Sequence, residues 1–255
     1  MISFFRKIRE RLLSESKISN YLLYAIGEIL LVMIGILLAL QVNEWNNDRI
    51  DKKKEQNILL NLRVDFQNNI SNIDEVYASF MQAYEASVDL LDIIKNDEDI
   101  DPQETERLID DIINKTKSLD LITGSIDEIF NTGSLHLIQD PVLRKDISNW
   151  SYYYTDTDDD IVIYKNYLFE FFIPSLTNKV ILRNMEVPDF FEPDVEFKNI
   201  SRSGFEIDYN KTLRTIEFEN EVYNNTLNYM YVINSYKVFK NYLENTLGLI
   251  EANIK

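Results

Sequence analysis

The chain has 255 residues, of which 45% are hydrophobic, with a net charge of −17, Gly 6, Pro 5 and Cys 0. This length leaves enough apolar material for one or two domains with a core, which excludes a disordered chain and a small disulfide-stapled scaffold. The scarcity of Gly and Pro favours a few long elements over many short strands, and the negative charge argues against nucleic acid as a partner. We therefore expect an all-α protein.

The first predicted element is a basic amphipathic arm over residues 1–20. Phe4 and Phe5 lie on one helical face, and Arg6 and Arg9 lie around the other. A helix of this kind binds the surface of an anionic cytoplasmic leaflet, and the alternative is a short solvated tail. In either case the arm is too short to be a cytoplasmic signalling domain.

A transmembrane helix is predicted over residues 21–42, which read YLLYAIGEILLVMIGILLALQV. At 1.5 Å per residue this run is about 33 Å long, enough for a hydrocarbon core of about 30 Å. A cleaved signal peptide is the alternative, but the run is long for one and no A-x-A site follows it. Trp45 comes directly after the span, where interfacial aromatic residues are expected.

The orientation of the span is predicted from the flanking positive charges. Residues 1–20 contain five Lys/Arg and residues 43–62 contain four. This small bias favours a cytoplasmic N-terminus. Residues 43–255 would then form a periplasmic helical domain of a single-pass inner-membrane protein.

One stripe of the predicted span carries the strongest candidate for an interface. Glu28, Val32, Gly35 and Ala39 recur at helical spacing, and Gly35-xxx-Ala39 is a small-xxx-small pattern that lets two membrane helices approach closely. A carboxylate inside the hydrocarbon is costly and is expected to be neutral, paired, or facing protein or water. We prefer self-association through this transmembrane interface, and the alternative is that Glu28 snorkels to the headgroups.

These strings also support a family resemblance. The runs FFRKIRERLL and YAIGEILLVMIGILLALQVNEWN resemble a family of single-span membrane proteins from Bacteroidota, and TGSLHLIQDPVLRKDI over residues 132–147 is similar to a second segment of it. The resemblance implies a membrane protein with its C-terminal part in the periplasm. It implies no reaction.

Beyond the span, the chain predicts a long amphipathic helix over residues 44–95 and a second helix over 102–118. Asp101, Pro102 and Glu104 match an N-cap, a first helical position and an acidic first turn. The long helix has apolar residues in steps of three and four, a pattern typical of one buried face. This stripe contains Leu59, Leu62, Phe66, Ile70, Ile73, Tyr77, Phe80, Tyr84, Val88 and Leu91.

The remaining helices are predicted over residues 125–132, between Gly124 and Gly133, and over 141–172 and 214–252. An irregular connection over 184–212 forms either an ordered cap or a partner-binding loop. Four long helices with short connections predict an extended antiparallel helical bundle with coiled-coil packing outside the membrane. The last helix has a stripe of apolar residues: Phe218, Val222, Leu227, Met230, Ile233, Tyr236, Leu243, Leu247 and Ile250. The aromatic runs at 150–154 and 167–172 are interpreted as core filling, or alternatively as a groove for an apolar partner.

No catalytic, cofactor-binding or metal site is predicted. The run DTDDD at 156–160 resembles the start of a calcium loop, but Ile161 and Tyr167 stand where Gly and Glu are needed, so a solvated acidic face is expected. His136 is the sole histidine, and we expect a packed or capping role for it. Nucleotide-binding, zinc-protease and redox motifs do not occur. The chain is therefore not expected to be an enzyme.

The sequence predicts a membrane-anchored periplasmic protein that acts by protein interaction, as a scaffold, assembly factor or sensing adaptor of an envelope complex. Its expected partners are the lipid bilayer and either a second copy or an envelope protein. The alternative is an accessory subunit of an ion-driven energy-transducing complex that uses the carboxylate of Glu28.

Overall fold

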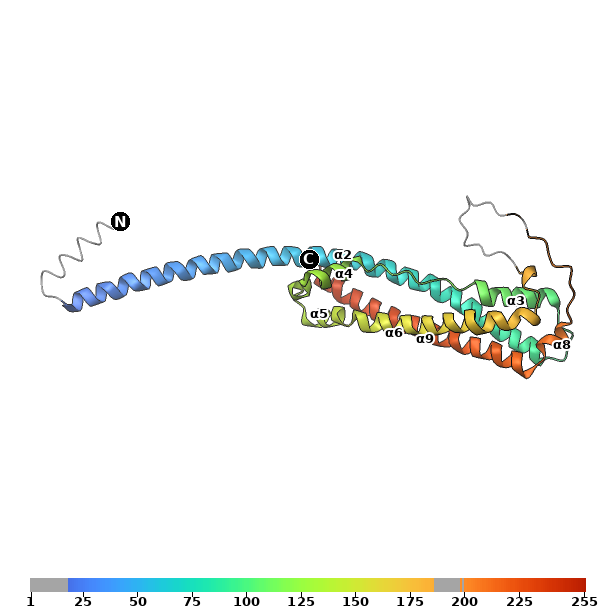
Figure 1. Cartoon of the computed structure of the whole chain (residues 1–255). Coiled ribbons are helices and arrows are strands. Elements are labelled where there is room, and N and C mark those ends of the chain that lie inside the picture. The colour runs from blue at the N-terminus through green and yellow to red at the C-terminus, as the bar shows by residue number, and fades with distance from the viewer. Residues whose placement is uncertain (1–17, 186–197, 199) are drawn as a thin grey trace. The chain divides into compact units, whose positions relative to one another are not determined.

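The computed structural model describes residues 18–185, 198 and 200–255. Within these ranges every regular element is a helix and no strand occurs, so the prediction of an all-α protein is confirmed (Figure 1). The chain divides into two compact units, residues 1–57 and residues 58–255.

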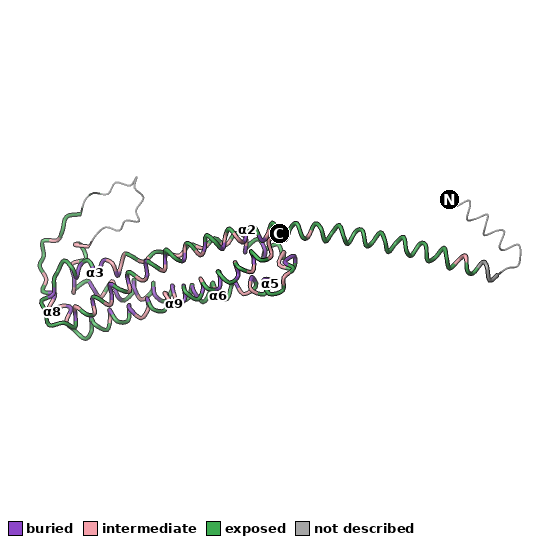
Figure 2. Tube along the Cα trace, turned by 180° about the vertical axis from the view of Figure 1, so that it is seen from behind, coloured by how far each residue is buried: buried purple, intermediate pink, exposed green. Residues whose placement is uncertain are grey.

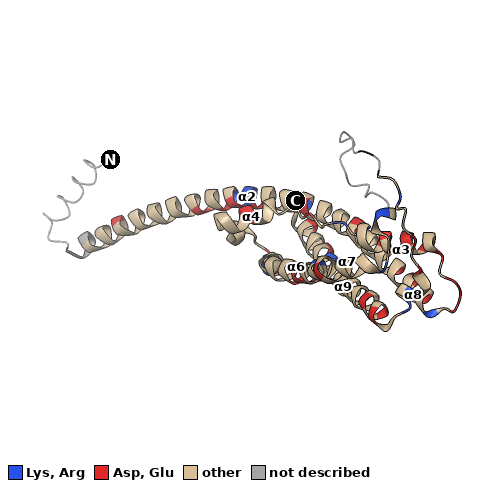
Figure 3. Ribbon diagram, turned by 45° about the vertical axis from the view of Figure 1, so that its right-hand side comes forward, with Lys and Arg blue, Asp and Glu red and all other residues tan. Residues whose placement is uncertain are grey.

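The described part of the first unit is the beginning of α2, a single helix that spans Ile18–Lys95. This helix contains an 18-residue window with a mean hydropathy of 2.5, in which no residue is buried. Figure 2 shows the beginning of α2 almost entirely exposed, and Figure 3 shows it almost free of charged residues. By length and composition, this one helix could cross a membrane. Nearly all of the arm predicted over residues 1–20 lies outside the described residues.

The second unit is built around three long helices that lie side by side in Figure 1: the second part of α2, α6 (Trp150–Tyr167) and α9 (Ile216–Asn253). The shorter elements are α3 (Pro102–Asn114), α4 (Gly124–Thr132), α5 (Pro141–Ser148), a π-helical turn (Leu168–Phe172), α7 (Ile173–Ser175), α8 (Tyr209–Leu213) and three 3₁₀ turns (Ser134–Leu137, Leu176–Asn178, Leu182–Asn184).

Side-chain contacts give the direction of α9 relative to α2. Gln67 bonds to Glu251, and Ser87 bonds to Thr226, so residue numbers rise along α2 while they fall along α9. Lys240 pairs with Asp74 between these two contacts. These two helices are therefore antiparallel.

The direction of α6 follows from its contacts with α2. Phe66 packs near Trp150 with ring centroids 5.6 Å apart, and Phe80 packs against Tyr164 at 5.2 Å, so numbers rise together along α2 and α6. These two helices are parallel, as the first and third helices of an antiparallel bundle with short connections are. The connection between them differs from the prediction, because the helix predicted over 102–118 ends at Asn114 and the chain then returns along α2 without forming a helix.

The buried face of α2 follows a strict alternation of three and four residues, the heptad spacing of coiled coils. From Leu59 onward the buried positions that follow this alternation are 59, 62, 66, 69, 73, 76, 80, 83, 87, 90 and 94, and Ser79 and Ala86 are buried beside them. α9 shows the same alternation at positions 218, 222, 225, 229, 232, 236, 239, 243, 246 and 250. Two long helices thus present matching seams to the core.

This spacing corrects part of the predicted stripes. Ile70, Tyr77, Tyr84 and Leu91 lie beside the seam, half-buried against the core, whereas the polar residue Asn69 occupies it. At the first of these positions the prediction chose the apolar Ile70 over the adjacent polar residue Asn69 and so moved off the seam. On α9 the stripe was wrong at Met230, whose side chain is half exposed, because the seam passes through Tyr229 instead.

The helix predicted over 141–172 is interrupted twice. α5 begins after Asp140, whose side chain accepts hydrogen bonds from the N–H groups of Val142 and Leu143, and it ends at Ser148. α6 then starts at Trp150 and gives way to the π-helical turn at Leu168. Leu168 and Phe172, four residues apart on one side of the turn, are both buried in the core.

Candidate functional site

The predicted transmembrane interface lies entirely on α2. At about 100° per residue, Glu28, Val32, Gly35 and Ala39 share one narrow face of the helix, and all four are exposed. A Cβ placed on Gly35 would meet nothing within 4 Å. The geometry leaves this face open to a partner, and self-association through it stays a prediction.

Of the predicted membrane-surface residues, the structure describes only Trp45. Trp45 lies on α2 and is 67% exposed. Phe4, Phe5, Arg6 and Arg9 lie outside the described residues. The membrane-surface role of these residues therefore stays a prediction.

The two candidates for metal chemistry form no such centre. Nδ1 of His136 lies 2.8 Å from the carbonyl oxygen of Gly133, which is the capping role expected for this side chain. In the DTDDD run, Asp160 accepts a hydrogen bond from Ser235, while Asp156 and Asp158 are exposed. Among the residues that the structure describes, no group of three or more Asp, Glu, Cys or His side chains could hold a metal ion.

The two aromatic runs serve the core only in part. Trp150 is 4% exposed and packs against Phe66 and Phe239, and Phe172 is fully buried. In contrast, Tyr152 is 67% exposed, as are Phe169 and Phe171 at more than 60%. Core filling accounts for the buried members, and the exposed ones leave apolar surface on α6 and the turn after it.

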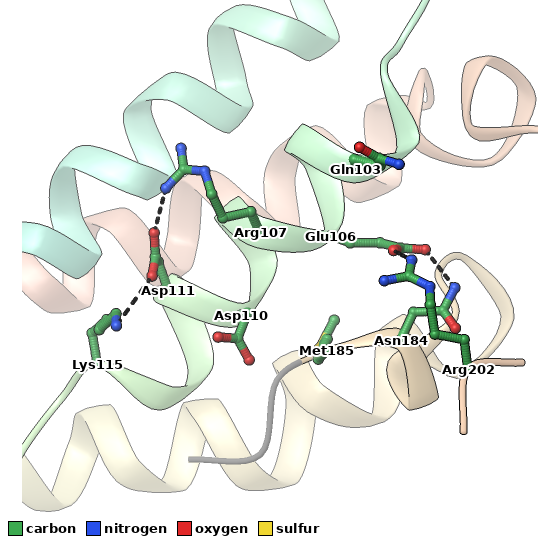
Figure 4. A pocket seen from close by; sticks show the side chains of 9 residues that line it. All are labelled: Gln103, Glu106, Arg107, Asp110, Asp111, Lys115, Asn184, Met185 and Arg202. Atoms are coloured by element: carbon green, nitrogen blue, oxygen red, sulfur yellow. Dashed lines mark hydrogen bonds and ion pairs between the residues drawn. The ribbon is translucent and has the colours of Figure 1, made fainter. Parts of the chain in front are cut away.

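The structure adds a pocket that the sequence did not predict, shown in Figure 4. It has a volume of about 490 Å³ and lies between α3 and the residues that flank positions 186–199. Its lining is mostly polar or charged: Gln103, Glu106, Arg107, Asp110, Asp111, Lys115, Asn184, Met185 and Arg202.

Glu106 is the centre of this pocket and is only 6% exposed. Its carboxylate accepts hydrogen bonds from Asn184 Nδ2 at 2.8 Å and from the Tyr209 hydroxyl at 3.1 Å, and it pairs with Arg202. Burial, with the nearby charge of Glu106, raises the pKa of the Tyr209 hydroxyl to about 12, so this hydroxyl stays protonated and donates at neutral pH. We call these four residues the Glu106 cluster.

On the other side of the pocket the charges also compensate one another. Arg107 bonds to Glu104 and to Asp111, each at 2.7 Å, and Lys115 lies 3.7 Å from Asp111. A buried carboxylate with three donors is stable without a ligand. The Glu106 cluster therefore acts as a structural anchor, because it ties Asn184 and Arg202, from either side of residues 186–199, to α3.

The sequence held one signal for this cluster. Glu106 precedes Ile109 by three residues and so shares the apolar face of α3, where an unpaired carboxylate is not expected. Its partners lie 78 to 103 positions away in the chain, which no local pattern reveals. The connection predicted over 184–212 is ordered at both ends, and residues 186–197 and 199 lie outside the described part.

Comparison of the chain with models of protein families, with curated proteins and with solved structures found no match. The functional argument therefore depends on the physical properties of the described residues.

Proposed function

We propose that the protein is a single-pass membrane protein whose residues 58–255 act by binding other proteins, as a scaffold, assembly factor or sensing adaptor of an envelope complex. The observation that carries this proposal is the exposed apolar stretch of α2. In residues 22–42, 14 large apolar side chains are each at least half exposed. At about 1.5–3 kcal/mol for burying each one fully, their transfer into lipid is favourable by on the order of 20 kcal/mol.

The same helix that carries this apolar stretch also contributes the α2 seam to the second unit. A retained anchor would therefore be covalently and helically continuous with the packed unit. We place the N-terminus, with its basic arm, in the cytoplasm and residues 58–255 in the periplasm, because positive residues are slightly more frequent before the span.

Membrane anchoring is tested by alkaline extraction of membranes that contain the full chain. The natural chain should stay in the membrane, whereas the pair Leu31→Lys and Ile34→Lys should be released, because two charges at the centre of the span are costly. The matched pair Leu60→Lys and Val64→Lys, at exposed positions of α2 outside the span, should stay in the membrane. Recovery of a mature chain that lacks residues 1–42 would overturn anchoring in favour of a cleaved signal.

Orientation can be measured with single cysteines, because the natural chain has none. A membrane-impermeant maleimide added to intact spheroplasts should label Ser151→Cys, an exposed position on α6, and should label Ser14→Cys only after the membrane is permeabilised. The reverse labelling pattern would refute the proposed orientation.

Self-association through the Glu28 stripe is tested by oxidative crosslinking in membranes. Val32→Cys lies within the stripe and should give a disulfide-linked dimer. Leu37→Cys lies on the opposite face of the same helix and should stay monomeric. Equal crosslinking at both positions would refute a specific interface.

A further inference from the structure

The chain between α3 and α4 runs alongside α2 in an extended conformation. The N–H of Lys117 donates to the Ser79 hydroxyl at 3.3 Å, whereas the N–H of Ile122 donates to Asn69 Oδ1 at 2.7 Å. Positions 69 and 79 are ten residues apart on a helix, or about 15 Å. Five residues of the segment cover that length, at about 3 Å each, which is close to the rise of a β-strand.

One edge of this extended segment is bonded to α2. Asn69 Nδ2 donates to the Ile122 carbonyl at 2.9 Å, and Asn72 Nδ2 donates to the Asp120 carbonyl at 3.0 Å. Side-chain amides of a helix thus take the place of a neighbouring strand. The backbone groups of Asp120 and Ile122 are fixed toward α2.

The other edge is open. The backbone groups of Asp120 and Ile122 face α2, and in an extended chain those of their neighbours Leu119 and Leu121 point to the opposite side; the N–H of Lys117 also faces α2, so this alternation begins after Lys117. These groups make no hydrogen bond within the described part of the chain. An unpaired edge of this kind is a template for an added strand.

A groove of about 320 Å³ lies between this segment and α6. Its apolar lining includes Leu119, Leu121 and Ile161, and its acidic lining consists of Asp120 and Asp158. No Lys or Arg lines the groove. The groove therefore favours a ligand that is apolar on one face and carries positive charge.

We propose that this groove binds an extended basic peptide segment of a partner protein, added as a strand along residues 119–121. The peptide backbone would pair with the open N–H and C=O groups of Leu119 and Leu121. Alternate apolar side chains would enter the groove, and Lys or Arg would meet Asp120 and Asp158. This inference rests on the proposed interaction role and specifies the chemistry of the partner.

The test measures binding to the full chain in neutral detergent micelles by fluorescence anisotropy. The probe is a fluorescein-labelled decapeptide of alternating Val and Lys. It should bind, whereas the same peptide with Glu in place of Lys should not. N-methylation of the four central residues removes N–H donors and keeps the charge, so it should weaken binding at least tenfold.

Matched substitutions separate the groove from the general negative charge of the protein. Asp120→Asn with Asp158→Asn should weaken binding at least fivefold, because both side chains line the groove. Asp156→Asn with Asp159→Asn makes the same change of charge on exposed residues of α6 outside the lining and should change binding less than twofold.

Equal weakening by the two pairs, or undiminished binding of the N-methylated peptide, would overturn the groove proposal. Failure of the Val-Lys peptide to bind would overturn it as well. Membrane retention and Val32→Cys crosslinking are measured on membranes before detergent is added. If these succeed while peptide binding fails, the groove proposal alone is wrong, and if they fail as well, the proposed function is wrong.

Discussion

Replacement of Asn69 by Ala should lower the free energy of unfolding by about 2–3 kcal/mol. Asn69 is fully buried in the seam of α2, and its amide both donates to and accepts from the backbone of Ile122, at 2.9 and 2.7 Å. Each hydrogen bond contributes about 1 kcal/mol net, and the part-buried backbone groups that lose their partner add a desolvation cost. Alanine removes both bonds at once.

Two further substitutions provide matched comparisons. Asn72→Ala removes one hydrogen bond, at 3.0 Å to Asp120, from a partly exposed side chain that water can replace, so it should cost about 0.5–1 kcal/mol. Asn69→Asp keeps the acceptor for the Ile122 N–H but turns a carboxylate oxygen toward the Ile122 carbonyl. It should cost about 3–5 kcal/mol at pH 7.

The loss of unfolding free energy caused by Asn69→Asp should become smaller as the pH is lowered. Burial would raise the pKa of the new carboxyl above its unfolded value of about 4, and a protonated carboxyl can donate to the Ile122 carbonyl. The protonated form therefore favours the folded state, and its contribution is lost as the pH rises through that raised pKa.

Urea unfolding of the full chain in micelles measures these differences. Trp45→Phe serves as the background, because it leaves Trp150 as the sole tryptophan, and Trp150 is 4% exposed within the core. If Asn69→Ala and Asn72→Ala lower the free energy of unfolding equally, the two hydrogen bonds between Asn69 and Ile122 do not anchor the extended segment to α2 as argued.

Three other sets of substitutions test the helix cap, the Glu106 cluster and a polar contact in the seam. The hydrogen bonds from the N–H groups of Leu143 and Val142 hold the pKa of Asp140 below its usual value. The stability that the ionised Asp140 side chain contributes is therefore present above the unfolded pKa and is lost in acid. The difference in free energy of unfolding between the natural chain and Asp140→Ser should vanish on titration to about pH 2. Glu106→Ala should destabilise by about 3–5 kcal/mol and Glu106→Gln by less, with faster hydrogen exchange over residues 200–213 in both. Ser87→Ala with Thr226→Val removes both partners of a buried 2.9 Å hydrogen bond, so a double-mutant cycle should show the pair costing less than the sum of the single changes.

Local signals in the sequence were sufficient for helix class and for most helix ends. Asp101 and Asp140 cap α3 and α5, where each is followed by proline at the first helical position. These features depend on neighbours within a few residues, which the sequence displays directly. The exposed apolar stretch of α2 is likewise a local property of composition.

Contacts between residues that are distant in the chain could not be predicted from such local signals. The seam of α2 includes Asn69 and Ser87, and a choice based on apolarity passes over polar residues whose partners are distant in the chain. The parallel arrangement of α2 and α6 depends on an extended return segment, and that segment is held by amides of α2 more than forty residues earlier. The Glu106 cluster needs three partners from beyond position 180, so the place of its carboxylate on the apolar face of α3 indicates that it is paired but not with which residues.

The order of synthesis gives the antiparallel pairing of α2 and α9 a kinetic consequence. α2 is complete at Lys95, but α9 ends at Asn253, so the α2 seam waits for nearly the entire remaining chain before its partner exists. At typical rates of translation this delay is roughly 10–30 s. Throughout that time a row of apolar side chains is available to lipid, to chaperones or to other nascent chains. Residues 115–125, which contact α2 through Ser79, Asn69 and Asp65, would shield part of that surface during the delay.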